Sequence, residues 1–413
     1  MKCRVIAVLG TRPEAIKLAL VIQELRRRPE EFEIAVVHTG QHRTMLDHAL
    51  NFFQIKPDFD LDVMRPNQTL NSLTCRVLDT VENACHRFEP HMVLVQGDTT
   101  TAFASSLAAF YCKIPVGHIE AGLRSGDIYN PFPEEVNRRM VSVMTEIHFA
   151  PTAQSRDNLL AEGVPSEKIV VTGNTVVDTL RALGQLPEQS WAGTPLAGIP
   201  QDGSRLILVT SHRRESWGND QEQMCLALKD LVEKHKDARV IYPVHMNPNV
   251  RSTVNALLKG SERIHLTEPL EYMTFVSLLR KCFLVLTDSG GIQEEAPTFG
   301  KPVLVLRKVT ERPEASQFGM AKIIGMSRDA IVHEADRLLT DTDAYLDMSE
   351  GNNPYGDGHG SERIVEAIAR WYARKTPLLE PDKQFKLPPR PIPRRRKTDN
   401  VASPLGAVAA GRE

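Results

Sequence analysis

The sequence predicts an α/β protein built from two doubly wound domains, each with a parallel sheet. Short apolar runs alternate with helical patterns along most of the chain, and this alternation is interrupted once near the middle. The length supports two domains, because 413 residues exceed what one hydrophobic core ordinarily organises. Strands that are apolar at nearly every position, rather than at alternate positions, indicate sheets covered by helices on both faces.

The individual elements are predicted from these patterns in chain order. Strands are expected at residues 4–9, 33–38, 92–96, 116–119, 147–150 and 169–172, and after the interruption at 206–210, 240–243, 264–266, 284–287 and 303–306. Helices are expected at residues 13–28, 70–88, 100–111 and 221–236. Because the strands are parallel, their carboxyl ends should line one edge of each sheet, where ligands bind in such folds.

The interruption sets the domain boundaries. Residues 185–205 contain three prolines and several glycines, a composition typical of an interdomain linker. The first domain is therefore expected at residues 1–184 and the second at residues 206–352, with a cleft between them. Residues 377–413 are rich in proline and carry a run of basic residues, so we expect a disordered tail there.

Composition excludes several classes of function. A formal net charge of -2 argues against nucleic acid or an anionic membrane as the main partner. The sequence contains no run of about 18 apolar residues and no signal-like segment, so a cytoplasmic location is expected. Six scattered cysteines are expected to be buried thiols. Neither a metal-ligand motif nor the NAD fingerprint is present, so we expect no metal and no cofactor.

Three carboxylates are predicted to share the ligand edge of the first domain. They are Asp98, Glu120 and Glu134, each just after a strand or at the start of a helix. Asp98 could instead cap a helix, and Glu134 could serve the helix dipole. Glu120 could instead pair with Arg124 or Arg138. Carboxylates close together push their pKa values apart, so one site can obtain both an acid and a base. The group therefore predicts acid–base catalysis.

Basic side chains are predicted to face the same cleft. In the first domain Arg12 and Lys17 lie at the start of a helix, which suits a phosphate unless both are ordinary surface charges. In the second domain His212 and Arg213 follow one strand and His245 follows the next. A histidine beside arginines suits a diphosphate and a proton transfer, although a lone histidine such as His245 is more often structural.

A glycine turn in the second domain is predicted to cradle a phosphate. Ser289, Gly290 and Gly291 lie between an apolar strand and a helix, and Glu295 follows one turn into that helix. Glu295 could accept hydrogen bonds from ribose hydroxyls, and Arg312 opens a later helix. The turn lacks the lysine of a P-loop, so an NTPase is not indicated.

Taken in order, these motifs resemble those of the non-hydrolysing UDP-N-acetylglucosamine 2-epimerases. The matching segments are GTRPEAIK, QHRTMLD, GDTTT, GHIEAGLR, PFPEEVNRR, TGNTVVDTL, SHRRESWG, YPVHMNPNVR, LTDSGGIQEEA, GKPVLVLR, TERPEA and NPYGDG. They extend over residues 1–375. The resemblance implies a GT-B-like fold in which residues 353–376 form a helix that crosses back onto the first domain.

The resemblance also implies roles for the candidate residues. The catalytic positions are Asp98, Glu120, Glu134 and His212. The positions that bind the UDP-sugar are Arg12, Lys17, Arg213, His245, Phe275, Ser289, Gly290, Gly291, Glu295 and Arg312. A second molecule of UDP-N-acetylglucosamine acts as an activator in many members, at positions that match Gln41, Glu134, Arg213 and His245. The sequence departs from the pattern of some members at Thr44, Asn67 and Leu270.

The implied reaction is the reversible epimerisation of UDP-N-acetylglucosamine to UDP-N-acetylmannosamine. It would proceed by elimination of UDP to 2-acetamidoglucal and re-addition, with no cofactor, and would supply bacterial surface polysaccharide. Family members are often homodimers. Three alternatives stay open: a hydrolysing 2-epimerase that releases UDP, a GT-B glycosyltransferase that needs an acceptor, and a non-catalytic sensor of UDP-sugars.

Overall fold

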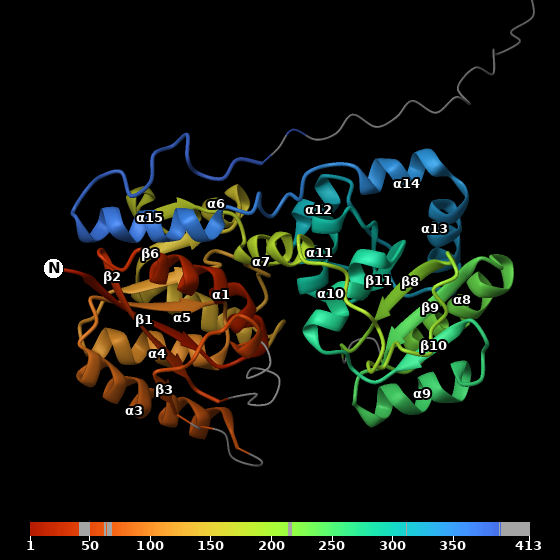
Figure 1. Cartoon of the computed structure of the whole chain (residues 1–413), viewed down its shortest axis with the longest axis horizontal. Coiled ribbons are helices and arrows are strands. Elements are labelled where there is room, and N and C mark those ends of the chain that lie inside the picture. Colours follow the sequence, from red (N-terminus) through yellow and green to blue (C-terminus); the bar gives the residue numbers. More distant parts are fainter. Residues whose placement is uncertain are drawn as a thin grey trace, which may run out of the picture.

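The structure is a computed structural model in which residues 1–40, 50–61, 63, 68–213, 217–310, 312–387 and 389 are described. It contains two parallel sheets, one in each half of the chain (Figure 1). The first sheet consists of β1 (Cys3–Leu9), β2 (Phe32–His38), β3 (Phe59–Asp60), β4 (Met92–Gln96), β5 (Val116–Ile119), β6 (Thr145–Ala150) and β7 (Ile169–Val171). The second consists of β8 (Arg205–Thr210), β9 (Ala238–Pro243), β10 (Ile264–Thr267), β11 (Leu284–Thr287), β12 (Val303–Val305) and β13 (Ala321–Ile323).

Both sheets are doubly wound. The strand order is β3-β2-β1-β4-β5-β6-β7 in the first sheet and β10-β9-β8-β11-β12-β13 in the second. The order reverses between β1 and β4 and again between β8 and β11. At such a point the loops after neighbouring strands diverge to opposite faces and leave room for a ligand. The loops that follow β4, β5, β8 and β11 carry most of the candidate residues.

Helices cover both faces of the first sheet. One face is covered by α1 (Arg12–Arg27), α7 (Thr175–Gly184) and α15 (Gly360–Tyr372), and the other by α3 (Leu70–Phe88), α4 (Thr100–Tyr111) and α5 (Glu134–Met144). Alternate residues of β1 show this directly, because Val5 and Ala7 belong to the core with α1 whereas Ile6 and Val8 belong to the core with α3 and α4. The helix α6 (Ala153–Ala161) and the short η1 (Ser166–Lys168) connect β6 to β7.

The second sheet is covered in the same way, and one apolar core joins the two halves. The helices α8 (Asn219–Lys234), α9 (Pro248–Leu258), α13 (Arg328–Thr340) and α14 (Thr342–Ser349) share one core. The helices α10 (Tyr272–Lys281), α11 (Gly290–Glu295) and α12 (Pro313–Gln317), with η3 (Ala296–Phe299), lie on the other face. Their apolar residues belong to the core that also contains α1 and α7. None of the helices in the described part of the chain has the length and apolar character that a membrane crossing requires.

The segment predicted as a linker, residues 185–205, packs against the second half. Trp191 is buried, and its indole N–H donates to Ser277 Oγ at 3.1 Å. Leu196 is buried in the same core. The segment between the halves is therefore held in place by packing and is not a free linker.

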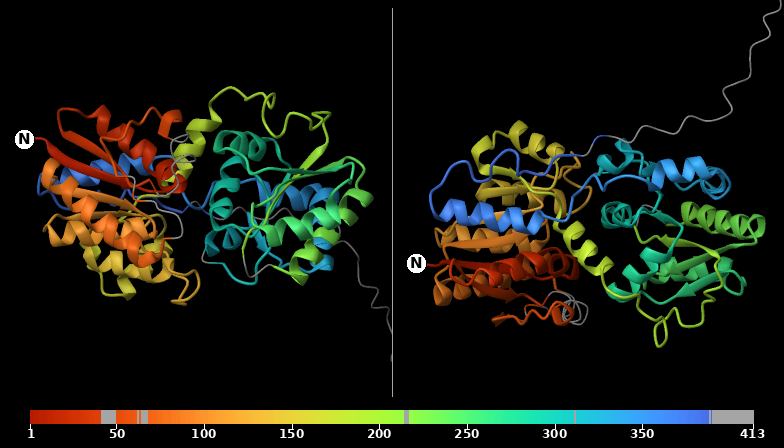
Figure 2. Two further views of the ribbon diagram at one scale, coloured as in Figure 1. Left: turned by 90° about the horizontal axis from the view of Figure 1, so that it is seen from below. Right: turned by 45° about the horizontal axis from the view of Figure 1, so that its top comes forward.

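A second connection returns the chain from α14 to α15, which packs on α1 (Figure 2). Tyr355 in this crossover is buried and bonded to both halves. Its carbonyl accepts from the backbone N–H of Asn174 at 2.7 Å, and its hydroxyl donates to the carbonyl of Arg312 at 3.0 Å. The crossover thus fixes the start of α12 relative to the first sheet.

The expectation that disorder begins at residue 377 does not hold for residues 377–387. The backbone N–H of Phe385 donates to Val171 O at 2.8 Å, and Val171 N–H donates to Gln384 Oε1 at 3.0 Å. Phe385 is buried, with the guanidinium of Arg363 5.9 Å from its ring centre. The segment covers β7, an edge strand whose backbone groups would otherwise lack partners, which explains why this proline-rich sequence is ordered.

Replacing Phe385 with alanine is expected to lower the free energy of unfolding by about 3 kcal/mol, because the ring is buried and its removal leaves a cavity. Chemical denaturation of the full chain measures this change. Lys386→Ala is the matched control, since Lys386 is exposed beside it. Equal stability of the two variants would contradict the docking of this segment.

Candidate active site

A buried carboxylate closes the loop between β1 and α1. Glu14 Oε2 accepts from the backbone N–H groups of Gly10 at 2.9 Å and Thr11 at 2.6 Å, and Glu14 Oε1 accepts from Thr99 Oγ1 at 2.6 Å. These bonds join the β1 loop to the β4 loop. The interpretation of this helix start as a phosphate site does not hold for these two N–H groups, because Glu14 already uses them. Arg12 and Lys17 on the same helix point to other partners.

Glu120 is buried between side chains from both halves. Its Oε2 accepts from Lys17 Nζ at 2.5 Å and from Gln96 Nε2, and its Oε1 lies 3.7 Å from Arg312 Nη2. Burial raises the pKa of Glu120, and the charge of Glu294 acts in the same direction against Lys17 and Arg312. A carboxyl group with a raised pKa and fixed cationic neighbours is suited to proton transfer near neutral pH.

The backbone of Glu120 supports a functional role. Its φ of +67° lies in the left-handed region, which side chains other than glycine rarely adopt. The structural alternative for this residue is wrong. Arg124 bonds to Glu162, with Nε 2.7 Å from Oε1, and Arg138 bonds to Asp98 and Glu135. Glu120 therefore turns away from both arginines and toward Lys17.

Asp98 and Glu134 lie beside the same edge of the sheet. Asp98 Oδ2 accepts from Arg138 Nε at 3.1 Å and also from its Nη2. The cap of α4 is Thr99, whose side chain accepts from Ala102 N–H, so Asp98 does not cap the helix. Glu134 is half-buried at the start of α5. Its burial raises its pKa, and the charge of Asp98 adds to this effect.

A second buried carboxylate organises the loop after β8. Asp288 Oδ2 accepts from the backbone N–H groups of His212 at 2.9 Å and Arg213 at 3.0 Å, and from Ser211 Oγ at 3.1 Å. Its Oδ1 lies 3.0 Å from His212 Nδ1. Burial opposes ionisation of Asp288, but the hydrogen bond and charge of His212 and these N–H groups hold its pKa below the usual value. His212 is thereby oriented with its other ring nitrogen away from Asp288. The ring of His245 lies 5.9 Å from that of His212.

The predicted phosphate cradle lies at the start of α11. Ser289 is the N-cap, and Gly290 and Gly291 form the first turn. A side chain at Gly291 would lie in ordinary van der Waals contact with Glu295 Oε1, at 3.8 Å, so Gly291 and Glu295 face the same space. Burial raises the pKa of Glu295 to about 7, and the charges of Lys17 and Arg12 oppose the rise. Arg12 of the first half therefore lies near α11 of the second.

Glu294 joins the two halves and was not predicted. Its side chain is buried, with Oε1 2.7 Å from Arg312 Nε and Oε2 3.6 Å from Lys17 Nζ. Its position beside Glu295 was the only signal in the sequence. Gln96 and Asp288 were also missed, because their partners are distant in sequence. Glu14 was missed although Thr11 and Glu14 form a capping box, a pattern that can be found in the sequence.

The remaining predicted residues either lie around the groups described above or fall outside the described part of the chain. Phe275 is half-buried on α10 and packs against the core, and Leu270 is buried nearby. Arg213 lies close enough to Glu134 that its charge lowers the pKa of that carboxyl. Gln41, Thr44 and Asn67 lie outside the described residues.

Only one group of side chains in the described residues has the spacing of metal ligands. It consists of Glu82, His86 and Cys112, at the ends of α3 and α4. These helices end where the following strands begin, so the group lies at the edge of the sheet opposite to Glu120. The candidate catalytic residues do not belong to it.

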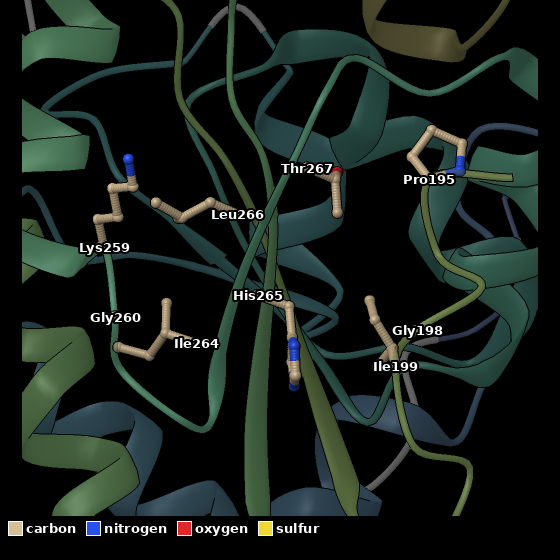
Figure 3. A pocket seen from close by; sticks show the side chains of 9 residues that line it. All are labelled: Pro195, Gly198, Ile199, Lys259, Gly260, Ile264, His265, Leu266 and Thr267. Atoms are coloured by element: carbon tan, nitrogen blue, oxygen red, sulfur yellow. The ribbon is translucent and has the colours of Figure 1, made fainter.

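A pocket of about 360 Å³ lies between the linker segment and β10 (Figure 3). Its lining combines the apolar side chains of Ile199, Ile264 and Leu266 with the polar side chains of Lys259, His265 and Thr267. None of the candidate catalytic or binding residues lines it. The candidate catalytic residues lie instead in the loops after β4, β5 and β8 and at the start of α5.

Known proteins are similar to this chain over nearly its whole length. A family model described as UDP-N-acetylglucosamine 2-epimerase matches residues 23–369. The UDP-N-acetylglucosamine 2-epimerase of Escherichia coli strain K12 is 49% identical over 372 residues, which cover 88% of this chain and 98% of the relative. A crystal structure of UDP-GlcNAc 2-epimerase from Neisseria meningitidis bound to UDP-GlcNAc has a TM-score of 0.83 and 46% identity, and covers 89% of this chain and 100% of that one.

A more distant structure agrees with these. The Methanocaldococcus jannaschii UDP-GlcNAc 2-epimerase in complex with UDP-GlcNAc and UDP has a TM-score of 0.73 and 30% identity, and covers 88% of this chain and 99% of that one. Two doubly wound halves joined by a returning helix define an α/β protein of the GT-B-like class. The chain belongs to the UDP-N-acetylglucosamine 2-epimerase family, as its motifs predicted. It is an epimerase and hence an isomerase, and the match is consistent with the non-hydrolysing type.

As the pH rises from 4.5 to about 7, ionisation of Glu295 is expected to lower the free energy of unfolding of the unliganded protein progressively. Its pKa rises from 4.5 to about 7 on folding. A carboxyl group of this kind contributes stability below its unfolded pKa, and that contribution is lost as the pH rises through the folded pKa. Glu295→Gln removes the effect, so the variant should gain stability relative to wild type across this interval.

Urea unfolding of wild type and Glu295→Gln at the two ends of the interval measures this difference. Glu362→Gln, an exposed change on α15, is the control and should show no such trend. A difference between wild type and Glu295→Gln that does not change with pH would contradict the expectation.

Proposed function

We propose that this protein binds UDP-N-acetylglucosamine between its halves and interconverts it with UDP-N-acetylmannosamine by eliminating and re-adding UDP. Relatives of known structure bind UDP-GlcNAc, and one binds UDP as well. The observation that carries the proposal is Glu120, a buried carboxyl group held by Lys17 of the first half and near Arg312 of the second. Such a group can exchange a proton with a sugar while its neighbours stay fixed.

The second half is the proposed binding site for UDP. The start of α11, with Ser289, Gly290 and Gly291, would donate hydrogen bonds from its N–H groups to the diphosphate. Glu295 would accept hydrogen bonds from the ribose, and Phe275 would lie beside the uracil. Arg12, Arg213, His245 and Arg312 would supply positive charge or hydrogen bonds to the UDP-sugar, and Lys17 would act through its ion pair with Glu120.

The first half is the proposed source of proton transfer. Asp98 and Glu120 follow β4 and β5, which are neighbours in the sheet, so both carboxyl groups lie at one edge. One carboxylate would take the C2 proton as the C1–O bond breaks, which forms the C1–C2 double bond of 2-acetamidoglucal and releases UDP. UDP would then re-form the C1–O bond while the other carboxyl group delivers a proton to the opposite face of C2.

Supporting residues complete this proposal. Glu134 would assist the proton-transfer pair. The charge of Asp98 raises the pKa of Glu134, which is consistent with the two carboxyl groups lying close together. His212, oriented by Asp288, would donate a hydrogen bond or proton to the departing diphosphate. Closure of the two halves would retain the glucal until UDP returns.

The products of a long incubation with UDP-N-acetylglucosamine alone test the proposal. Anion-exchange chromatography should show UDP-N-acetylmannosamine accumulating to an equilibrium with little free UDP. A hydrolysing enzyme would release UDP in proportion to time. A glycosyltransferase would produce nothing without an acceptor, and a sensor would leave the substrate unchanged.

Other parts of the predicted function remain proposals. A second UDP-N-acetylglucosamine would bind as an activator near Glu134, Arg213 and His245, together with Gln41. A cytoplasmic location and the use of the product in surface polysaccharide are expected from the family resemblance.

We also propose a homodimer formed through the exposed face of α5. Val136, Met140 and Val143 form an apolar stripe on this helix, and Val143 is 85% exposed. Phe110 and Tyr111 at the end of α4, which packs beside α5, are also exposed. A helix face of this kind can pair with its own copy about a two-fold axis and remove its apolar surface from water.

Val143→Asp is expected to convert a dimer to a monomer in sedimentation velocity, because the charge would be buried against the partner. Leu160→Asp, an exposed leucine on α6, is the control and should remain dimeric. If wild type and Val143→Asp have the same sedimentation coefficient, this face is not the dimer interface.

A further inference from the structure

Four charged side chains form a buried cluster where the halves meet. Lys17 Nζ lies 2.5 Å from Glu120 Oε2 and 3.6 Å from Glu294 Oε2. Arg312 lies 2.7 Å from Glu294 through Nε and 3.7 Å from Glu120 through Nη2. The two cations are therefore shared by two carboxyl groups. Each half supplies one cation and one carboxyl group.

A hydrogen bond to the backbone of Glu294 also fixes its position. Its carbonyl accepts from Asn353 Nδ2 at 2.8 Å, and the same nitrogen donates to Thr298 Oγ1 at 2.8 Å. Asn353 Oδ1 accepts from the N–H of Tyr355 at 2.8 Å, and the hydroxyl of Tyr355 donates to Arg312 O. Glu294 and Arg312 are thus fixed to the same crossover between the halves.

We propose that Glu294 is a positioning residue for the reaction, which keeps Lys17 and Arg312 in place while Glu120 gains and loses a proton. When Glu120 is protonated, the two cations would lose a partner and could move or repel one another. Glu294 would remain a negatively charged partner for both cations, whether Glu120 is ionised or protonated. This inference rests on the proposed role of Glu120.

Within the described part of the chain, a small number of other charged groups influence the cluster. On α1 they are Lys17 and Arg12, on α11 Glu294 and Glu295, and at α12 Arg312 and Glu314, while β4 contributes the neutral amide of Gln96. Among the described residues, Glu120 and Glu294 are the carboxyl groups that contact both Lys17 and Arg312. Removal of the charge of Glu294 should therefore affect Glu120 more than removal of the others.

Glu294→Gln, which keeps the shape of the side chain, is expected to lower kcat by about tenfold to a hundredfold with little change in KM. The pH optimum of kcat should move to lower pH, because Glu120 loses a negative neighbour that raises its pKa. Glu294→Asp restores the charge and should restore the pH optimum even where kcat stays low. A residue with only a structural role would not produce this shift.

Glu314→Gln is the matched control. Glu314 is also buried at the junction of the halves, where its Oε1 accepts from Thr152 Oγ1 at 2.7 Å. Its kcat and pH optimum should stay close to those of wild type. If wild type epimerises UDP-N-acetylglucosamine but Glu294→Gln keeps the same kcat and pH optimum, the inference is wrong and the proposed function stands. If wild type does not epimerise, the proposed function itself fails.

Discussion

Glu120→Gln is expected to lower kcat by about a hundredfold to ten-thousandfold, the range associated with loss of a general acid or base. Glutamine keeps the size of the side chain and can still accept a hydrogen bond from Lys17, which lies 2.5 Å from Glu120 Oε2. It cannot exchange a proton with C2. The effect should fall on kcat because the missing step occurs after the substrate is bound.

Stability and a matched variant separate this effect from damage to the fold. Lys17 and Arg312 keep Glu294 as a partner in Glu120→Gln, so folding should be retained. Glu162→Gln removes a carboxylate from Arg124 instead, and it should leave kcat within about twofold of wild type. A Glu120→Gln enzyme with wild-type kcat would exclude Glu120 from proton transfer.

Asp98→Asn is expected to reduce kcat to a similar extent, about a hundredfold or more. Asp98 is the partner of Arg138, but Glu135 Oε2 stays 3.0 Å from Arg138 Nη1, so the arginine keeps a buried counter-charge. The variant should therefore fold. Its defect should be chemical rather than structural.

Solvent exchange can show which carboxyl group serves which face of C2. In deuterium oxide, a variant that lacks the group facing one epimer should exchange the C2 proton of the other epimer only. Asp98→Asn and Glu120→Gln should then show opposite preferences for UDP-N-acetylglucosamine and UDP-N-acetylmannosamine. Equal exchange of both epimers in either variant would contradict the assignment of these two residues as the proton-transfer pair.

Much of the fold could be predicted because the strands are continuous apolar runs between clear turns. The strands at residues 92–96, 116–119 and 284–287 and the helices at 70–88 and 100–111 agree with the structure in their bounds. The strands β3 and β13 were missed. They are short edge strands, and their exposed positions lack the apolar run that marks a buried strand.

The site was predicted less completely than the fold. Residues at strand ends, such as Asp98 and Glu120, can be found because the topology brings those ends together. The partners of Glu120 could not be found in this way, because Arg312 comes from the other half and its approach depends on how the halves pack. The docking of Phe385 on β7 is likewise set by tertiary contacts. The contact of Glu14 with the start of α1 is local and could have been predicted from the capping-box pattern of Thr11 and Glu14.

The central claim is that a proton leaves and returns to C2 while UDP is eliminated and retained. Proton NMR of UDP-N-acetylglucosamine with the enzyme in deuterium oxide tests it directly, by following the C2 signal of both epimers together with free UDP. The account predicts that UDP-N-acetylmannosamine forms with deuterium at C2 and that free UDP stays a small fraction. An epimer that keeps its original C2 proton, or no epimer at all, would contradict it.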